Sequence, residues 1–323
     1  MFDFQITKAL GLEGPSERGM AHDFLPSYRA SIADLSSETA GATTGVLNRI
    51  YVRVGTSIHP SLLQLLLLMY RSRIGQLSSP ARAASEINKE VARVTHGRIP
   101  QIVTARSLDG LGMVLISALY FKDQWQKTFI TRGKQNFLTP SGEKLVDMME
   151  QKAELKHGEF STFDVVELPF KDKAYCMLLL RPLERNMTAV RDLRSKLDSL
   201  DLRTIRATMS SKEVEVYMPR FKLEPEYSLR SSLAQLGIKK LFTSGAEWTG
   251  FDGLTMSNSD VYHKVFLEVN EKGAEAGGAM YVIRNLALPA RSLVRFRLDR
   301  PFFAIVYNKK FQFNMFSAYV ASP

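Results

Sequence analysis

The stretch HKVFLEVNEKGAEAGGAM, His263 to Met280, joins an apolar run to a segment made mainly of glycine and alanine. It continues as YVIRNLALPARS up to Ser292, which is apolar but carries two arginines. The part from Val269 to Ser292 is too rich in small residues for an ordinary core element and too apolar for an ordinary surface loop. Because protein interiors are close-packed, a segment with small side chains is suited to enter one.

The composition is that of a globular protein. The chain has 323 residues, of which 45% are hydrophobic and 24% are charged, as in soluble folded domains. No linker or low-complexity tract divides the chain, so we predict one domain over residues 1–323. A single cysteine excludes an internal disulfide, and the apolar run around Cys176 predicts a buried thiol that packs as a small hydrophobic side chain.

The net charge of +10 permits binding to polyanionic glycans. The charge is scattered along the chain, however. Its densest patch, MYRSRIGQ, holds only Arg71 and Arg73, which we interpret as a solvated face. No signature of a DNA- or RNA-binding fold accompanies the charge, so nucleic acid is not an expected partner.

The longest apolar run, LLQLLLLMY from Leu62 to Tyr70, predicts a buried helix. It is too short to cross a bilayer, which needs about 20 residues, so no membrane partner is expected. A second helix is predicted in SEINKEVARVTHG, with Ser85 and Glu86 as start signals and Gly97 as the stop. At the N-terminus, no basic start followed by an apolar stretch marks a secretory signal.

Strand patterns dominate the rest of the chain. The run GMVLISALYF predicts a strand covered on both faces, and DVVELPF, AYCMLLLRP and EVEVYMPRF also have strand patterns. SLRSSLAQLGI predicts a short helix that ends at Gly237, and the stretch from Ser292 to Pro323 holds three candidate strands. Helices first and strands later indicate an α+β fold built around large, mostly antiparallel sheets.

Motifs of catalysis and metal binding are absent from the sequence. There is no nucleophile elbow, no phosphate-binding loop and no dinucleotide-binding loop. Glu213 and Glu215 alternate along one strand pattern and are interpreted as a solvated strand face. We therefore expect no enzyme, no cofactor and no metal site. None of the histidines has the sequence spacing of metal ligands. They are His22, His59, His96, His157 and His263.

Eight separated segments, in order, resemble the serpin family. The third, VLISALYFKDQW, is similar to the family's LVNAIYFKGxW, and the last two are the most specific. The resemblance implies the serpin fold: a large central sheet with further sheets, helices mainly from the N-terminal half, and an exposed reactive-centre loop at about 271–292. The segments are LNRIYV (47–52), INKEVARVTHGRI (87–99), VLISALYFKDQW (114–125), VELPF (166–170), EVYMPRFKLE (215–224), LAQLGIKKLF (233–242), HKVFLEVNEKGAEAGGAM (263–280) and DRPFFAIV (299–306).

The resemblance implies a suicide inhibitor of serine proteases. A serpin offers its loop as bait, and the cut loop then inserts as a strand into the central sheet. Alternation along such a strand would place Ala274, Ala276 and Gly278 on one face and Glu275 on the other, facing solvent. The hinge residues that the resemblance implies are Glu271, Gly273, Ala274, Glu275, Ala276, Gly277, Gly278 and Ala279.

The family places the cleaved bond about sixteen residues after the glutamate that begins the hinge. Counted from Glu271, this is Ala287–Leu288, and alanine would suit an elastase-like protease. Arg291–Ser292 is the alternative, of the kind that trypsin-like proteases cut. Arg284–Asn285 ranks third, because it leaves a short inserting arm.

The resemblance also implies a sheet-opening site. His263 resembles the histidine at the opening point, with Ser117 where the family has an asparagine, and Trp125 resembles the tryptophan where the loop first enters. Ala318 stands where the family has a glycine, which would cost about 1 kcal/mol if that position had a positive φ. The first two helices of the family and its first strand are expected to be missing.

Two functions remain open at this point. The first is a serine protease inhibitor, with a target protease as its partner, no cofactor, and a monomeric, extracellular protein implied by the family. A single glycosylation sequon at Asn186 is a hint of secretion. The second is a non-inhibitory serpin-fold binding protein or an inactive truncated serpin.

Overall fold

The computed structural model describes residues 29–33, 35, 42–243, 251–252, 259–274 and 293–323. The chain divides into two compact units. The prediction of a single domain stays a prediction. Unit 1 consists of Met1–Glu38, Thr44–Phe121 and Leu223–Phe266, and unit 2 consists of Thr39–Thr43, Lys122–Lys222 and Leu267–Pro323.

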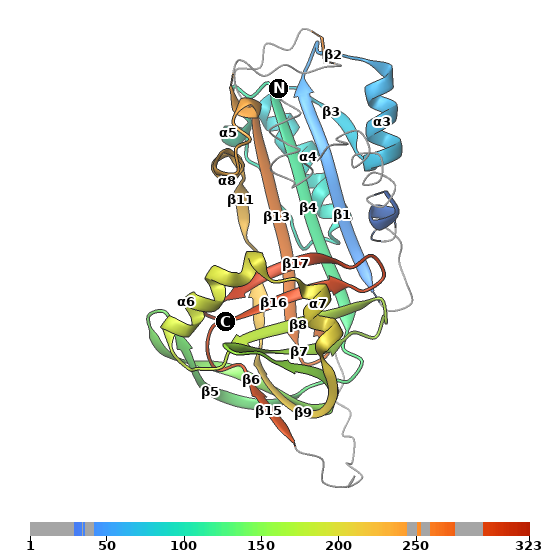
Figure 1. The fold of residues 1–323 in the computed structure, drawn as a ribbon. Helices are drawn as coiled ribbons and strands as arrows, with labels where there is room; N and C mark the ends of the chain where they lie inside the picture. Colours follow the sequence, from blue (N-terminus) through green and yellow to red (C-terminus); the bar gives the residue numbers. More distant parts are fainter. Residues whose placement is uncertain (1–28, 34, 36–41, 244–250, 253–258, 275–292) are drawn as a thin grey trace. The chain divides into compact units, whose positions relative to one another are not determined.

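A seven-stranded sheet contains the strands that matter for the site. Its order is β10-β13-β14-β4-β1-β3, with β11 paired to β13. Figure 1 shows β13, β4 and β1 side by side. It has parallel ladders, β1–β3 and β13–β4, as well as antiparallel ones. The strands are β1 (Thr43–Arg53), β3 (Arg73–Leu77), β4 (Met113–Gln124), β10 (Phe221–Leu223), β11 (Glu226–Ser228), β13 (Ser259–Asn270) and β14 (Gly273–Ala274).

In unit 1 the helices pack around this sheet. Ile87 and Val91 of α4 are fully buried and lie in one core cluster with Val114, Ile116 and Ala118 of β4. The helices are α3 (Pro60–Tyr70), α4 (Pro80–Val94), α5 (Ala105–Leu108), α8 (Arg230–Gln235) and the 3-10 helix η2 (Lys240–Phe242), and a small sheet is formed by β2 (Ser57–Ile58) and β12 (Phe251–Asp252).

Unit 2 is built on an eight-stranded sheet of order β15-β9-β6-β7-β8-β16-β17, with β5 paired to β6. Helices α6 and α7 cover its core through Leu193, Leu202 and Ile205. The elements are β5 (Ile130–Thr139), β6 (Gly142–Glu159), β7 (Phe163–Pro169), β8 (Tyr175–Pro182), α6 (Met187–Lys196), η1 (Leu197–Ser199), α7 (Leu202–Thr208), β9 (Ser210–Pro219), β15 (Val294–Arg297), β16 (Phe302–Asn308) and β17 (Phe313–Val320).

The predicted α+β fold and its strands are confirmed. The runs DVVELPF, AYCMLLLRP and EVEVYMPRF form β7, β8 and β9, and the C-terminal stretch forms the three strands β15 to β17. The short helix α8 is followed by Gly237 at φ +94, as predicted. Burial along β4 alternates between buried and half-buried residues, so the prediction that both of its faces are covered is only partly right.

Two predictions about helices are wrong in detail. The run Leu62–Tyr70 is helical, but α3 has no buried residue, and Leu67 and Leu68 are 50% and 55% exposed. The apolar run signalled a helix correctly, but its burial depends on what packs against it. Helix α4 begins at Pro80 after the N-cap Ser79, five residues before the predicted start, because proline fits the first helical turn.

Candidate functional site

The predicted hinge begins inside the seven-stranded sheet. Gly273 and Ala274 form the short strand β14, which pairs antiparallel with β13 and with β4. A Cβ atom on Gly273 would lie 2.1 Å from the carbonyl oxygen of Asp123, and the φ of Gly273 is +154°. Only glycine fits so close to the neighbouring backbone. Ala274 is fully buried and lies opposite Val269 and Asp123.

Beyond β14 the two flanking strands pair with each other. β13 and β4 form a parallel ladder that runs from Ser259 opposite Met113 to Phe266 opposite Tyr120. The start of the hinge therefore lies where one strand already separates the pair. The remaining predicted hinge residues, Glu275, Ala276, Gly277, Gly278 and Ala279, lie outside the described residues, as do Arg284, Ala287, Leu288, Arg291 and Ser292 of the candidate bonds.

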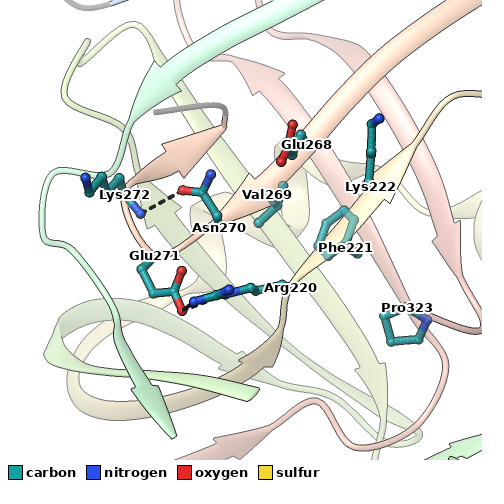
Figure 2. A pocket seen from close by; sticks show the side chains of 9 residues that line it. All are labelled: Arg220, Phe221, Lys222, Glu268, Val269, Asn270, Glu271, Lys272 and Pro323. Atoms are coloured by element: carbon teal, nitrogen blue, oxygen red, sulfur yellow. Dashed lines mark hydrogen bonds and ion pairs between the residues drawn. The ribbon is translucent and has the colours of Figure 1, made fainter. Parts of the chain in front are cut away.

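Glu271 anchors the turn that leads into the hinge. Its carboxylate accepts hydrogen bonds from Arg220 Nε at 2.7 Å and from the hydroxyl of Thr131 at 2.8 Å. Figure 2 shows the ion pair between Glu271 and Arg220. Burial opposes ionisation of this carboxyl, but the hydrogen bonds outweigh it and hold its pKa below the usual 4.5. The main-chain carbonyl of Glu271 accepts a further bond from Phe129 N–H at 2.7 Å.

A cavity of about 450 Å³ lies beside this anchor (Figure 2). Arg220, Lys222 and Lys272 line it together with Glu268 and Glu271. Opposite charges alternate around its wall, so the cavity favours no single charge of ligand. The cavity leaves space around the turn at Glu271, and its lining residues do not indicate a catalytic function.

Trp125 holds the end of β13 against the hinge turn. It is 3% exposed and stacks on Phe170 at 4.5 Å between ring centroids. Its indole N–H donates to the carbonyl of Asn270 at 2.9 Å, and its backbone N–H donates to the carbonyl of Lys272 at 2.8 Å. The structure thus places Trp125 beside the start of the hinge.

Asp123 is a site residue that the sequence reasoning did not single out. Its carboxylate is fully buried and accepts hydrogen bonds from the backbone N–H groups of Gln124 and Asp172. Burial raises its pKa to about 7, although both hydrogen bonds oppose the shift. The segment FKDQW has aspartate where the family motif FKGxW has glycine, and this substitution is the signal that could have identified it.

His263 and Ser117 lie directly opposite each other in the parallel ladder. Both residues are half-buried. Burial lowers the pKa of His263, and a hydrogen bond with the backbone of Ser117 opposes this shift.

Other sequence-based interpretations were resolved by the structure. Ala318 lies in β17 opposite Ala304 and has no positive φ, so the strain considered for that position does not arise. Cys176 is fully buried, and burial raises the pKa of its thiol to about 12. Glu213 and Glu215 are half-buried and form ion pairs with Lys152 and Arg295, which fits a structural role.

Arg220 and Thr131 were also missed, because nothing in their local sequence marks them. Thr131 lies in β5 and Arg220 lies in the turn after β9, and only the fold brings them to Glu271. Among the described residues, no cluster of histidine, cysteine and acidic side chains could hold a metal ion. Within the same residues, no helix is long and apolar enough to span a bilayer.

Comparison with known families and proteins gives a consistent result. The model of the family described as Serpin (serine protease inhibitor) matches residues 3–323. Among curated proteins, the chain is 30% identical to the leukocyte elastase inhibitor of Bos taurus, over 99% of this chain and 86% of that protein. It is 31% identical to Ipis-1 of Ixodes persulcatus, over 88% of this chain and 75% of that protein.

Solved structures show the same fold at lower sequence identity. A serpin of the insect Tenebrio molitor superposes with a TM-score of 0.81 at 22% identity, covering 100% of this chain and 90% of that one. Protease nexin-1, solved with heparin, has a TM-score of 0.81 at 21% identity, covering 99% and 90%. Uncleaved ovalbumin has a TM-score of 0.79 at 24% identity, covering 99% and 91%.

Proposed function

Because the chain belongs to the serpin family of serine protease inhibitors, we propose that it traps its target protease as a suicide substrate. The proposal rests mainly on one observation, the pairing of β14 with both β13 and β4. The hinge starts in the position that an inserted strand would occupy, with a glycine where the backbones are closest.

The two registers of β14 define where the rest of the loop would go. If β14 were extended in the same register, each further loop residue would pair one residue earlier on both β13 and β4. On this register Gly277 would lie between Phe266 and Tyr120, and Arg284 between Ser259 and Met113. The same residues are opposite each other in the parallel ladder, so the segment 277–284 would replace that ladder without a shift of register.

The register also bears on the cleaved bond. A cut at Ala287–Leu288 or at Arg291–Ser292 leaves the whole segment 277–284 free to insert. A cut at Arg284–Asn285 leaves an inserting segment whose last residue would lie at the last pair of the ladder, Ser259 and Met113. We propose Ala287–Leu288 as the reactive bond and keep Arg291–Ser292 as the alternative. Relatives of this chain that are named leukocyte elastase inhibitors support the first choice, with an elastase-like target.

The reaction would then follow the chemistry of acyl transfer. The serine hydroxyl of the protease attacks the carbonyl carbon of Ala287, and its proton passes to the protease's general base. The bond to Leu288 breaks, and the new amine at Leu288 leaves with a proton. Residues up to Ala287 stay bound to the protease as an ester. Insertion of the hinge as a strand would displace the protease before water hydrolyses this ester.

Denaturing gel electrophoresis tests the proposal. The protein is incubated with an elastase-like and, separately, with a trypsin-like serine protease. We expect a complex that survives denaturation with the elastase-like enzyme, and release of the fragment 288–323, identified by its mass. Release of 292–323 would assign the bond to Arg291–Ser292 instead. Cleavage without a stable complex, with either enzyme, contradicts suicide inhibition.

A serpin fold without inhibitory activity is the alternative function. The buried carboxylate of Asp123 favours it, because it fastens the backbone of Gln124 and of Asp172 where the hinge enters. Thermal unfolding before and after cleavage of the loop separates the two functions. A large rise in melting temperature on cleavage indicates that the sheet accepts the strand, and an unchanged melting temperature supports the alternative.

The cellular setting and the remaining partners belong to the same proposal. We propose an extracellular monomer, in keeping with the single sequon at Asn186. The side chain of Asn186 caps α6 by accepting a hydrogen bond from Ala189 N–H at 2.8 Å. Polyanionic glycans are a proposed second partner, supported by the net charge of +10 and by the heparin in the solved structure of protease nexin-1.

A further inference from the structure

A second cavity, of about 580 Å³, lies wholly within unit 1 and is strongly cationic. Strands β1 and β3 and the C-terminal ends of α3 and α4 contribute its wall. The charged side chains that line it are four arginines, one glutamate and a histidine. They are Arg49, Arg71, Arg73, Arg93, Glu90 and His96.

The one carboxylate of this cavity is already engaged. Glu90 accepts hydrogen bonds from Arg49 Nε and from the hydroxyl of Tyr51, both at 2.8 Å. The pKa of Tyr51 is raised by its burial and by Glu90, so the hydroxyl stays protonated as a donor at neutral pH. Glu90 therefore balances only Arg49, and among the described residues no carboxylate compensates the other three guanidinium groups on the wall.

Arg71, Arg73 and Arg93 are exposed, and the part of the chain that the structure describes offers none of their side chains an ion pair. In the parallel pairing of β1 and β3, Arg73 lies directly opposite Arg49. Because Glu90 already balances Arg49, the charge that an anion would compensate at this pair is that of Arg73.

Cations near the end of a helix often serve the helix dipole. Here Arg71 is the C-cap of α3 and Arg93 lies in the last turn of α4. In the described residues, however, neither guanidinium donates a hydrogen bond to a carbonyl of its helix. Arg73 belongs to a strand. The helix dipoles thus account for the positions of Arg71 and Arg93, but not for the gathering of all three arginines at one cavity.

The ends of two helices meet at the same place. The described residues include three non-glycine positions with positive φ, and two of them, Arg71 at +47° and His96 at +51°, line this cavity. Both follow the last turn of a helix, where a left-handed residue commonly ends the helix. Next to Arg71, the buried Ser72 donates its hydroxyl to the carbonyl of Asn48 at 3.0 Å, which holds the turn against β1.

We propose that this cavity is a binding site for a small oxyanion ester, a phosphate or sulfate ester. Tetrahedral oxyanions match the guanidinium fork, which binds two oxygens at once. The volume is that of a site for a small organic molecule. Arg73 and Arg93 supply the primary contacts, Arg71 closes the wall from the end of α3, and Glu90 keeps Arg49 in position.

Isothermal titration calorimetry on the full chain tests the site with four probes: inorganic phosphate, inorganic sulfate, inositol hexakisphosphate and a fully sulfated disaccharide. The test variant is the double substitution Arg73→Ala with Arg93→Ala. A charge-matched control is Arg106→Ala with Arg203→Ala, two exposed arginines that do not line the cavity. Thermal unfolding of both variants checks that they fold.

We expect at least one polyvalent probe to bind the wild type, the control to bind it equally well, and the test variant to bind it at least ten-fold more weakly. Tighter binding of inositol hexakisphosphate would identify a phosphate ester, and tighter binding of the disaccharide a sulfate ester. Equal weakening in both variants would show that net charge alone attracts the probe, which overturns the site. Failure of all four probes to bind the wild type overturns it as well.

Discussion

Two ladders of this molecule differ in how deeply their side chains are buried. In unit 2, β8 and β16 pair antiparallel, and every residue of β16 is buried. In unit 1, β4 and β13 pair in parallel, and the residues of β13 from Tyr262 to Val265 are all half-buried. Parallel pairing is slightly weaker per residue, and half-buried side chains lose less contact when a ladder opens.

The difference indicates which ladder can separate during function. A strand entering β8–β16 would have to displace close-packed side chains on both faces. A strand entering β4–β13 meets buried side chains on β4, such as Val114 and Ile116, but half-buried ones on β13 from Tyr262 to Val265. It also continues the register of β14, which is already in place. The largest consequence concerns Ala274, the fully buried residue at the point of entry.

The substitution Ala274→Arg is expected to abolish the denaturation-resistant complex with the target protease. An arginine here would bring an unpaired charge between β13 and β4, which costs several kcal/mol, so the cut loop would not insert. Gel electrophoresis after incubation with the protease should show cleaved protein only. The exposed substitution Lys310→Arg is the control and should leave the complex unchanged. A complex formed by Ala274→Arg would show that insertion begins elsewhere.

Truncations in the two ladders compare their packing directly. Leu178 in β8 is fully buried, whereas Leu119 in β4 is half-buried. We expect Leu178→Ala to lower the free energy of unfolding by about 3 kcal/mol and Leu119→Ala by about 1 kcal/mol. Denaturant titration of each variant measures the two values. If both substitutions lower the free energy of unfolding by the same amount, the two ladders are packed equally well, in contrast to what the burial of their residues indicates.

The buried carboxyl of Asp123 should make stability depend on pH. Its pKa is raised by burial from the usual 3.8 to about 7, so the folded chain keeps a proton that the unfolded chain releases between these values. The stability contributed by this group is therefore present at low pH and lost as the pH rises toward 7. Asp123→Asn cannot ionise and should lack this dependence. Melting temperatures between pH 4 and pH 8 measure the difference, and parallel profiles for the two proteins would contradict it.

The smallest expected effect concerns the anchor of the hinge. Arg220→Met removes the ion pair with Glu271. This is a surface ion pair, since the arginine side chain is 46% exposed. We expect a loss of about 1 kcal/mol of unfolding free energy. The effect should be present above pH 4.5 and fade as the pH falls through the lowered pKa of Glu271. Denaturant titrations at pH 7 and pH 3 test this, and an equal loss at both would exclude the ion pair as its source.

Much of the fold follows from local patterns. The alternating and apolar runs predicted β7, β8, β9 and the three C-terminal strands, because side chains alternate along a strand whatever its neighbours are. The family motifs directed attention to His263, Ser117 and Trp125, and the structure places Trp125 at the hinge. The run of small residues from Gly273 predicts a hinge, and its first two residues, Gly273 and Ala274, form β14.

By itself, then, the sequence determined the fold class, and it predicted a hinge with residue types suited to insertion, since these depend on composition and spacing. Only the tertiary structure decided which groups meet: Arg220 and Thr131 at Glu271, the backbone of Asp123 at Gly273, and the arginines of four separate elements at one cavity. It also left the leucines of α3 exposed. The physical reason is that burial, charge balance and close approach depend on partners far away along the chain, which no local pattern specifies.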